Sequence, residues 1–210
     1  MSTTTLDRWR IARFNAFQWR HGLKTEQKLA LALGMAVVTG ILAQARIPLP
    51  WTPVPITGQT FAALLSGVLL GGLWGGISMV LYAVLGAAGV PWFAGWQGGL
   101  TYLLGPTGGY VFGFILAALF IGHLTDRYIN ARQFKSLLVI MVLANFLIIY
   151  LPGLLQLGLW LSVIKGQSVG LSQLLTMGFF PFIIGDLIKV ILLAALAWGI
   201  TPKKAFFNQG

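Results

Sequence analysis

The sequence predicts an all-α integral membrane protein, a bundle of six transmembrane helices with both termini in the cytoplasm. Of its 210 residues, 57% are hydrophobic and only 9% are charged, whereas about a quarter are charged in an ordinary soluble domain. The stretch 47–125 contains no Asp, Glu, Lys or Arg. Polar side chains cannot cover such a chain in water, which excludes a soluble enzyme, a disordered tail and a nucleic-acid-binding domain.

The basic residues cluster at the edges of the apolar runs, which is how membrane proteins encode their orientation. With six spans and a cytoplasmic start, only Arg46 and Lys165 fall outside, and Lys189 lies within a span. We therefore expect both termini in the cytoplasm. The basic residues on the cytoplasmic side are then Arg8, Arg10, Arg13, Arg20, Lys24, Lys28, Arg127, Arg132, Lys135, Lys203 and Lys204.

Residues 1–28 form a basic leader in which aromatic residues alternate with arginines. Two interpretations stay open. The leader is either a helix on the inner leaflet, with arginines toward anionic lipid and rings at the headgroups, or a frayed segment that only fixes topology. The membrane domain is predicted at 29–200, and a short cytoplasmic tail at 201–210.

The first span is expected at 29–45. Ala32 and Ala36 lie one helical turn apart, a spacing that allows close helix approach. From spacing alone, internal packing is favoured over a smooth face for a partner membrane protein.

A proline-rich connection at 47–55 follows and cannot be a regular helix. The next apolar region, 61–90, contains a glycine-rich break at 71–76. Because a helix of about 20 residues already spans a bilayer, we expect two short or tilted spans joined by a tight turn at this break.

The remaining spans are separated by an external loop, a basic internal loop and a second external loop. The first external loop, 91–99, is uncharged and rich in Trp, Phe and Gly. The fourth, fifth and sixth spans are expected at 103–124, 136–157 and 174–199, and the second external loop at 158–173.

Asp186 and Lys189 are the ionisable residues within an apolar span. Either charge alone is costly in hydrocarbon, and intramembrane charges mark functional sites by default. Spaced i, i+3, they share one helix face and partly neutralise each other. We expect a polar floor for a ligand with hydrogen-bond donors and acceptors, the alternative being an ion pair that only holds the bundle together.

No catalytic residues, metal ligands or cofactor are predicted. The sequence has no Gly-Lys dipeptide for a phosphate-binding loop and no His-Glu-x-x-His motif. Gly166-Gln-Ser-Val-Gly170 matches a nucleophile-elbow pattern, but both histidines fall on the opposite side of the membrane, so no base reaches its serine. A membrane enzyme is therefore disfavoured, and any ATP-driven transport needs another subunit.

Four motifs, taken together and in this order, carry a family resemblance. Pro53-Val-Pro-Ile-Thr-Gly-Gln59 precedes the second span. Gly89-Val-Pro-Trp-Phe-Ala-Gly-Trp-Gln-Gly-Gly99 is followed by Leu104-Gly-Pro-Thr-Gly-Gly-Tyr110, and Gly185-Asp-Leu-Ile-Lys189 lies in the last span. Over roughly 28–200 the chain resembles the BioY family, the biotin-specific substrate-binding (S) components of energy-coupling factor (ECF) transporters.

The resemblance implies a biotin-binding subunit in a prokaryotic inner or plasma membrane. It captures biotin from outside and moves it inward with a transmembrane T component and a pair of ATPase subunits. The alternative is an S component for a different vitamin. The resemblance also implies that Ala32 and Ala36 contact the T component, which reverses the preference drawn from spacing.

The resemblance further implies that Asp186 and Lys189 are the ligand-binding pair. Gln97 stands before Gly-Gly, where some family members carry an asparagine. Biotin suits these residues, because Asp186 and the Gln97 amide can read the N–H and C=O groups of its ureido ring. Which end of biotin Lys189 meets stays open.

Four aromatic side chains are expected to wall the bicyclic ring of biotin: Trp92, Phe93, Trp96 and Tyr102. The loop 47–55 is expected to act as a lid, because prolines stiffen it and it carries no charge. Gln59, at its end, adds a polar contact in one interpretation and only starts a helix in the other.

Overall fold

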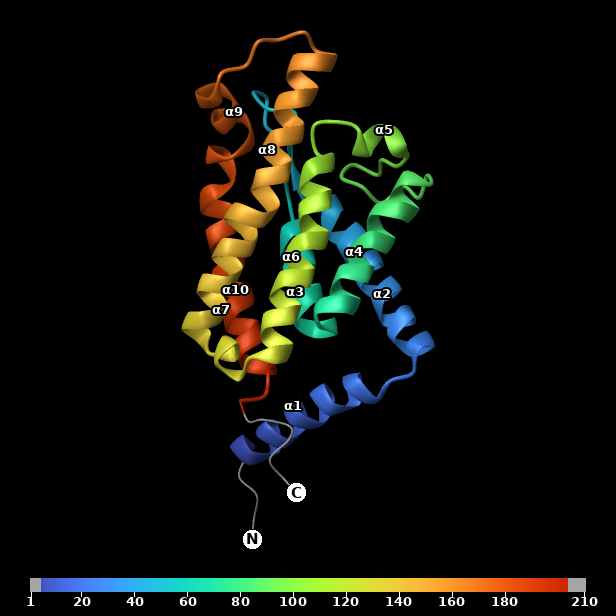
Figure 1. Cartoon of the computed structure of the whole chain (residues 1–210), viewed down its shortest axis with the longest axis vertical. Helices are drawn as coiled ribbons and strands as arrows, with labels where there is room; N and C mark the ends of the chain where they lie inside the picture. Colours follow the sequence, from blue (N-terminus) through green and yellow to red (C-terminus); the bar gives the residue numbers. More distant parts are fainter. Residues whose placement is uncertain (1–4, 204–210) are drawn as a thin grey trace.

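The computed structural model describes residues 5–203 and consists almost entirely of helices (Figure 1). In chain order its elements are α1 (Thr5–Gly22), α2 (Thr25–Gln44), β1 (Arg46–Ile47), β2 (Ile56–Thr57), α3 (Gln59–Leu70), α4 (Gly72–Ala87), α5 (Leu100–Leu103), α6 (Gly108–Arg127), η1 (Ile129–Arg132), α7 (Phe134–Leu143), η2 (Ala144–Ile149), α8 (Tyr150–Leu159), η3 (Trp160–Ile164), α9 (Leu171–Gly178), η4 (Phe180–Phe182) and α10 (Ile183–Ile200).

Four helical segments are long and apolar enough to cross a membrane: Thr25–Gln44, Gly108–Arg127, Phe134–Ile164 and Leu171–Ile200. Two shorter apolar helices, α3 and α4, lie between the first and second of these. The chain is thus mostly helical, with the apolar segments of a multi-pass membrane protein. The predicted proline-rich connection is indeed non-helical, and the short antiparallel pair β1–β2 joins its two ends.

The break between α3 and α4 is tighter than predicted. It consists of Gly71 alone, whose φ of +84° is a conformation that side chains rarely adopt. Behind it, a Cβ on Gly122 of α6 would lie 2.6 Å from the Gly72 Cα, so glycines bring these helices into backbone contact. The short α3 and α4 therefore pack closely on α6.

The last two predicted spans need correction. The fifth segment continues as helix to Ile164, and only the connection before Leu171 is irregular, so most of the expected loop 158–173 is helical. The sixth segment is broken at Phe179, where α9 ends and a short 3₁₀ turn containing Pro181 leads into α10. Proline has no N–H to continue a helix, and the break places Asp186 in the first turn of α10.

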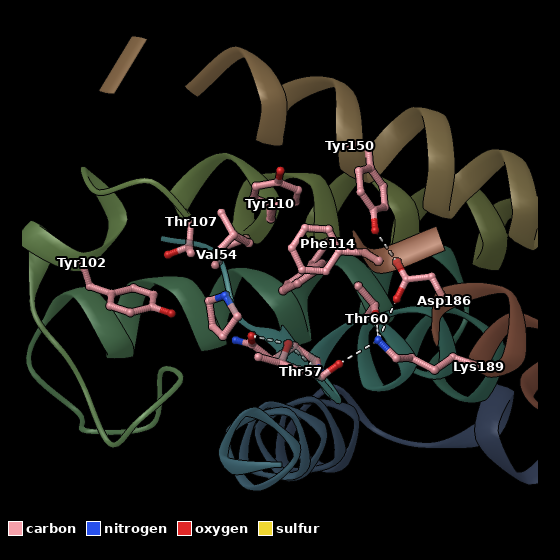
Figure 2. Close-up of a pocket in the computed structure, with 14 residues that line it drawn as sticks. Val54, Thr57, Thr60, Tyr102, Thr107, Tyr110, Phe114, Tyr150, Asp186 and Lys189 are labelled. Atoms are coloured by element: carbon pink, nitrogen blue, oxygen red, sulfur yellow. Dashed lines mark hydrogen bonds and ion pairs between the residues drawn. The ribbon is translucent and has the colours of Figure 1, made fainter. Parts of the chain in front are cut away.

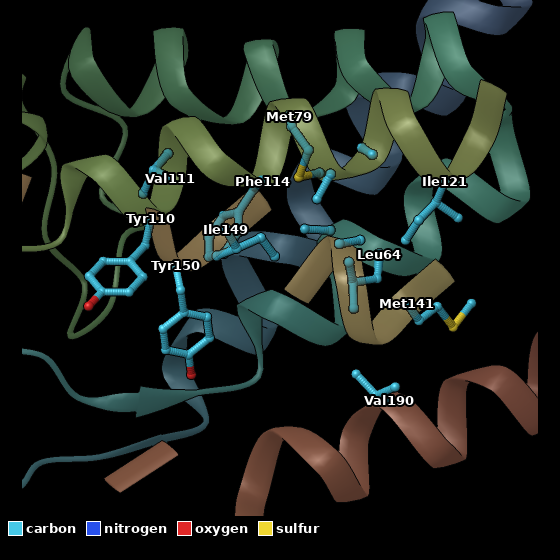
Figure 3. Close-up of a cluster of buried hydrophobic side chains, with 14 of the residues drawn as sticks. Leu64, Met79, Tyr110, Val111, Phe114, Ile121, Met141, Ile149, Tyr150 and Val190 are labelled. Atoms are coloured by element: carbon cyan, nitrogen blue, oxygen red, sulfur yellow. The ribbon is translucent and has the colours of Figure 1, made fainter. Parts of the chain in front are cut away.

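The centre of the bundle is α6, which packs against α3, α4, η2 and α8. Small residues on α6, including Ala117 and Ala118, are fully buried and let its neighbours approach. Around them lies a continuous core to which α3, α7 and α10 contribute Leu64, Met141 and Val190 (Figure 3).

The helix α1 crosses one end of the bundle, and the described end of the chain after α10 lies at that same end (Figure 1). We call this end the base. Arg20 of α1 forms an ion pair with Asp126 of α6. The guanidinium groups of Arg20 and Arg132 each lie over the Phe17 ring, 4.0 and 4.6 Å from its centroid. The leader is therefore helical and docked over residues 5–22, whereas 1–4 and the tail residues 204–210 lie outside the described residues.

Candidate ligand-binding site

A cavity of about 50 Å³ is lined by residues of β2, α3, α6, α8 and α10 (Figure 2). Tyr102 and Thr107 stand at one end of this inner cavity, and Asp186 and Lys189 at the other (Figure 2). The walls between them are largely apolar, with Val54 and Phe114 among the lining residues. The inner cavity is therefore polar at its ends and mostly apolar between them, although Thr57 and Gln59 also line it.

Asp186 is only 3% exposed and is held by three side chains. Its Oδ1 accepts from Lys189 Nζ at 2.7 Å, and its Oδ2 accepts from Asn145 Nδ2 at 2.9 Å and from the Tyr150 hydroxyl at 2.6 Å. A carboxylate offers about four acceptor positions. Asp186 can therefore accept one further N–H from a ligand without losing a bond.

Lys189 is in a different state, because its three N–H donors already have acceptors. Besides Asp186, Nζ donates to the Thr57 carbonyl at 2.8 Å and to the Thr60 hydroxyl at 3.2 Å. An ammonium has three donors and no acceptor. A ligand can bond to Lys189 only by replacing one of these partners, the weakest by distance being Thr60.

A π-helical turn explains how Asn145 and Tyr150 both reach the same oxygen of Asp186. The two residues are five positions apart, and in an α-helix they would point in different directions. The stretch η2, from Ala144 to Ile149, is π-helical, and its wider turn brings residues five apart onto one side. Such turns are frequent at functional sites. Asn145 Oδ1 is buried and has no hydrogen-bond partner among the described residues.

A larger hollow of about 510 Å³, which we call the outer vestibule, adjoins the inner cavity. Pro55, Tyr102 and Thr107 line both hollows, so these side chains stand between them. Gln97 and Arg46 line only the outer vestibule. A small-molecule site typically occupies about 300–1,000 Å³, so the outer vestibule has the size for a ligand and the inner cavity holds the buried polar groups.

The Gly-Pro-Thr-Gly-Gly-Tyr motif contributes Thr107 to the wall between the two hollows, and its Gly-Gly-Tyr part starts α6. A Cβ on Gly108 would lie 2.6 Å from Gln156 Nε2, and one on Gly109 would lie 2.8 Å from the Pro152 carbonyl carbon. Both glycines therefore let α6 pack closely against α8. Gln156 Nε2 donates to the carbonyls of Leu103 and Gly105, and Tyr110 donates to the Gly178 carbonyl at 2.8 Å.

The structure brings some of the predicted aromatic residues to the hollows and not others. Tyr102 lines both of them. Phe93 is completely buried and stacks on Tyr102, with ring centroids 4.5 Å apart, so it supports the wall from behind. Trp92 packs against Gly40, and Trp96 is 70% exposed. Among the predicted wall residues, Phe93, Trp92 and Trp96 do not line either hollow.

Gln59 lines the inner cavity and also joins it to the 91–99 loop. Its Oε1 accepts from the Thr57 hydroxyl at 2.9 Å and its Nε2 donates to the Tyr82 hydroxyl at 2.6 Å. Tyr82 in turn donates to the Trp92 carbonyl at 3.2 Å. Both interpretations of Gln59 thus have support in its position, which is at once a helix start and a cavity wall.

Sequence reasoning missed Gln44, which fixes the 91–99 loop. Its Nε2 donates to the carbonyls of Trp92 and Phe93, and its Oε1 accepts from the backbone N–H groups of Gly95 and Trp96. It also missed Asn145, Tyr150, Thr57 and Thr60. Only the apolar setting of Asn145 signalled a role, because a lone amide in a membrane span needs a buried partner.

The proline-rich loop covers the inner cavity. Val54 and Pro55 line it, and Val54 is itself buried. The Thr52 hydroxyl donates to the Met177 carbonyl of α9 at 2.7 Å, which ties the loop to that helix.

Ala32 and Ala36 are both 0% exposed, on the side of α2 that packs against α3 and α4. In this conformation neither offers a surface to a partner, and both serve internal packing. The exposed side of α2 carries larger side chains, among them Leu33, Val37 and Ile41.

Among residues 5–203, no three His, Asp or Glu side chains come together as a metal site would require. The basic residues at the base lie far from the cavity, and Asp186 and Lys189 are the charged groups that line it. The site is thus suited to binding an uncharged polar group deep inside, beside an apolar body.

This chain is similar in sequence to several known proteins. The sequence model of the BioY family matches residues 15–205. The "Probable biotin transporter BioY" of Methanothermobacter thermautotrophicus is 54% identical over 69% of this chain and 92% of its own length. The "Biotin transporter BioY" of Thermotoga maritima is 38% identical over 75% of this chain and 86% of its own.

The fold also has a solved counterpart. A crystal structure of the S component for biotin from an ECF-type ABC transporter superposes with a TM-score of 0.72 at 27% identity. The match covers 84% of this chain and 93% of that one.

Proposed function

The chain belongs to the BioY family, and on that premise we propose that it is the biotin-binding S component of an ECF transporter. The observation that carries the proposal is the inner cavity, where a buried carboxylate with one spare acceptor position stands at the end of an apolar passage. The ureido ring of biotin offers N–H donors to such a carboxylate, and its sulfur-containing ring suits apolar walls.

In the proposed complex one ureido N–H donates to the spare acceptor position of Asp186, and the ureido carbonyl replaces Thr60 as an acceptor for Lys189. Tyr102 and the Phe93 ring behind it form one wall of the passage. Gln59 holds Thr57 in place, and Gln97 meets the ligand in the outer vestibule. Trp92 and Trp96 act through the shape of their loop. These assignments rest on position and chemistry.

We propose that the loop 47–55 is a lid. It supplies Val54 and Pro55 to the inner cavity and is tied down by Thr52. Biotin is larger than the inner cavity, so the loop must shift for the ligand to enter. Once closed, the lid removes water from around Asp186 and Lys189, and this strengthens their electrostatic bonds to the ligand.

The proposed topology has six spans with both termini in the cytoplasm of a prokaryotic cell, in its inner or plasma membrane. Six apolar helical segments, counting α3 and α4, are available for it. The basic side chains of η1 and α1 gather at the base, which is the distribution expected of a cytoplasmic face. The helix α1 would lie along the inner leaflet, because Trp9, Trp19 and Arg8 are exposed on it.

The energy for inward transport would come from a T component and a pair of ATPase subunits. The exposed side of α2, with Leu33, Val37 and Ile41, is the part of that helix that such a partner could contact in this conformation. A role for Ala32 and Ala36 would require α2 to separate from α3 and α4.

The test is a titration of the purified full-length protein in lipid nanodiscs with biotin, followed through the fluorescence of its 8 tryptophans. We expect biotin to bind saturably. Labelled biotin should bind as well, and other vitamins should not displace it. Absence of saturable binding, together with a different vitamin identified by mass spectrometry in the purified protein, would replace biotin as the substrate.

A further inference from the structure

Arg46 is a cation at the outer vestibule, and no acidic side chain among the described residues neutralises it. The chain has only 4 acidic residues. Asp7, Asp126 and Asp186 form ion pairs with Arg10, Arg20 and Lys189. The fourth, Glu26, lies in the first turn of α2, whereas Arg46 follows the end of that helix. Twenty residues of helix extend about 30 Å, which is well beyond the range of an effective ion pair in water.

The position of the Arg46 side chain is set by its neighbours. Arg46 pairs with Thr57 in the β1–β2 ribbon, and its guanidinium lies against the 91–99 loop, where a Cβ on Gly95 would approach its Cζ to 2.7 Å. Gly95 has a φ of +80° and leaves this space open. The guanidinium therefore lies over the loop that carries Gln97, and both residues line the outer vestibule.

The ribbon also connects Arg46 to the inner cavity. Thr57, directly opposite Arg46, accepts a hydrogen bond from Lys189 through its carbonyl. Opposed residues of an antiparallel pair have Cα atoms about 4.5–5.5 Å apart. One ligand could therefore reach from Asp186 and Lys189 to Arg46, because only the width of this ribbon separates the two places.

The two cations differ in what they can offer an anion. Lys189 has an acceptor for each of its N–H groups and shares its charge with Asp186. Arg46 has five N–H donors in a planar fork that matches a carboxylate, and no ion pair with any described residue. The chemistry thus separates the ends of the site into a neutral polar end inside and a cationic end outside.

We propose, resting on the function proposed above, that Arg46 binds the carboxylate of biotin in the outer vestibule. The ligand is then oriented with its ureido ring inward, at Asp186 and Lys189, and its acyl chain passing Tyr102 and Thr107. Arg46 is the residue that distinguishes biotin from neutral analogues of the same shape. With this assignment Lys189 meets the ureido oxygen, as in the proposed complex.

The experiment compares biotin with biotinamide, in which a neutral amide replaces the carboxylate, on the full-length protein in nanodiscs. Wild type is expected to bind biotin about tenfold more tightly than the amide, because one charge-assisted bond at a partly exposed site has about this effect. Arg46→Gln is expected to weaken biotin binding about tenfold and leave the amide unchanged. Arg46→Lys is expected to keep part of the preference.

Lys165→Gln is the matched control. Lys165 lies at the same end of the molecule, over the ring of Trp160, which also lines the outer vestibule. Its removal changes the net charge as Arg46→Gln does, so a long-range attraction would fall equally in both variants. The inference predicts that Lys165→Gln keeps the full preference for biotin.

The inference is overturned if Arg46→Gln keeps the preference for biotin, if Lys165→Gln loses it to the same degree, or if wild type binds biotin and biotinamide equally. In each of these results biotin still binds, and the proposed function stands. Failure of wild type to bind both ligands would instead remove the proposed function.

Discussion

Asp186 in the inner cavity and Asp126 at the base each pair with a basic residue, yet their surroundings differ. A cavity adjoins both pairs, but Asp186 is held by the side chains of Asn145, Tyr150 and Lys189. Asp126 binds Arg20 and accepts from the Gly72 backbone N–H, while Arg20 also donates to the Val68 and Leu69 carbonyls.

The base is therefore joined largely through main-chain groups, and several segments meet there. Arg132 donates to the carbonyls of Thr125, Asp126 and Pro202, and thus links α6, η1 and the end of the chain. The comparison teaches that an ion pair must be interpreted from its other partners. A pair that bonds to main-chain groups of several segments holds a fold, whereas a carboxylate that is held by side chains and keeps one acceptor position is available to a ligand.

The largest effect is expected for Lys189→Met. This change leaves Asp186 as an unpaired buried carboxylate and also releases the Thr57 carbonyl. Breaking a buried pair on one side costs about 3–5 kcal/mol of folding stability. The ligand also loses a charged hydrogen bond of about 1.5–3 kcal/mol, so biotin affinity should fall about a hundredfold in a titration. Wild-type affinity in a folded Lys189→Met protein would show that the cavity pair is structural, like the base pair.

At the base, Arg20→Gln should lower the free energy of unfolding by about 2 kcal/mol, less than a fully buried pair because Asp126 is partly exposed. Denaturant unfolding in detergent measures this, and limited proteolysis should cut α1 faster. Arg8→Gln, an exposed position on the same helix, is the control. Biotin affinity should be the same in both variants. A loss of affinity confined to Arg20→Gln would mean that the base influences the binding site.

Tyr150→Phe removes one hydroxyl donor to Asp186 while Asn145 and Lys189 remain. One hydrogen bond to a charged group contributes about 1.5 kcal/mol, so biotin affinity should fall about tenfold. Tyr110→Phe is matched to it, because Tyr110 lines the same cavity but donates to the Gly178 carbonyl. Equal losses in the two variants would mean that packing, and not the bond to Asp186, is responsible.

Thr52→Val removes the hydrogen bond that ties the loop to Met177. Losing a neutral hydrogen bond costs about 1 kcal/mol, and biotin should dissociate about fivefold faster with its association rate little changed. Stopped-flow fluorescence measures both rates. Thr176→Val, which loses only a local bond to Ser172, should leave them unaltered. An unchanged dissociation rate in Thr52→Val would mean that this hydrogen bond does not hold the lid closed.

The smallest effect concerns pH at the base. Burial, together with Arg13 and Arg132, lowers the pKa of Lys203 to about 8 from an ordinary 10.5. Between these values the unfolded chain binds more protons than the folded one, so the free energy of unfolding should rise as the pH rises. Thermal unfolding between pH 7 and 9.5 should show a smaller rise in Lys203→Met than in wild type. Identical pH profiles would mean that Lys203 does not contribute to the stability of the base.

Much of the fold could be predicted because it depends on local chemistry. The charge-free stretch, the prolines at 47–55 and the glycine at 71 act within a few residues of themselves. The break at Pro181 could not be predicted from hydropathy, because an apolar run of this length has the hydropathy of one continuous span.

The binding site could be predicted only in part. The i, i+3 spacing is enough to place Asp186 beside Lys189 on one face. Asn145 and Tyr150 come from 41 and 36 residues away, and they meet Asp186 only because η2 departs from α-helical geometry. Ala32 and Ala36 show the same limit, since a small-residue spacing favours close packing without saying against which partner.

The most direct test of the account compares Asp186→Asn with Asp126→Asn in one biotin titration on nanodisc-embedded protein. Each variant removes one negative charge from one ion pair and keeps the size of the side chain. We predict a ten- to hundredfold loss of affinity in Asp186→Asn, from about 1.5–3 kcal/mol of charged hydrogen bonding, and no change in Asp126→Asn. Unchanged affinity in a folded Asp186→Asn protein, or an equal loss in both variants, would contradict the assignment of the cavity pair to the ligand.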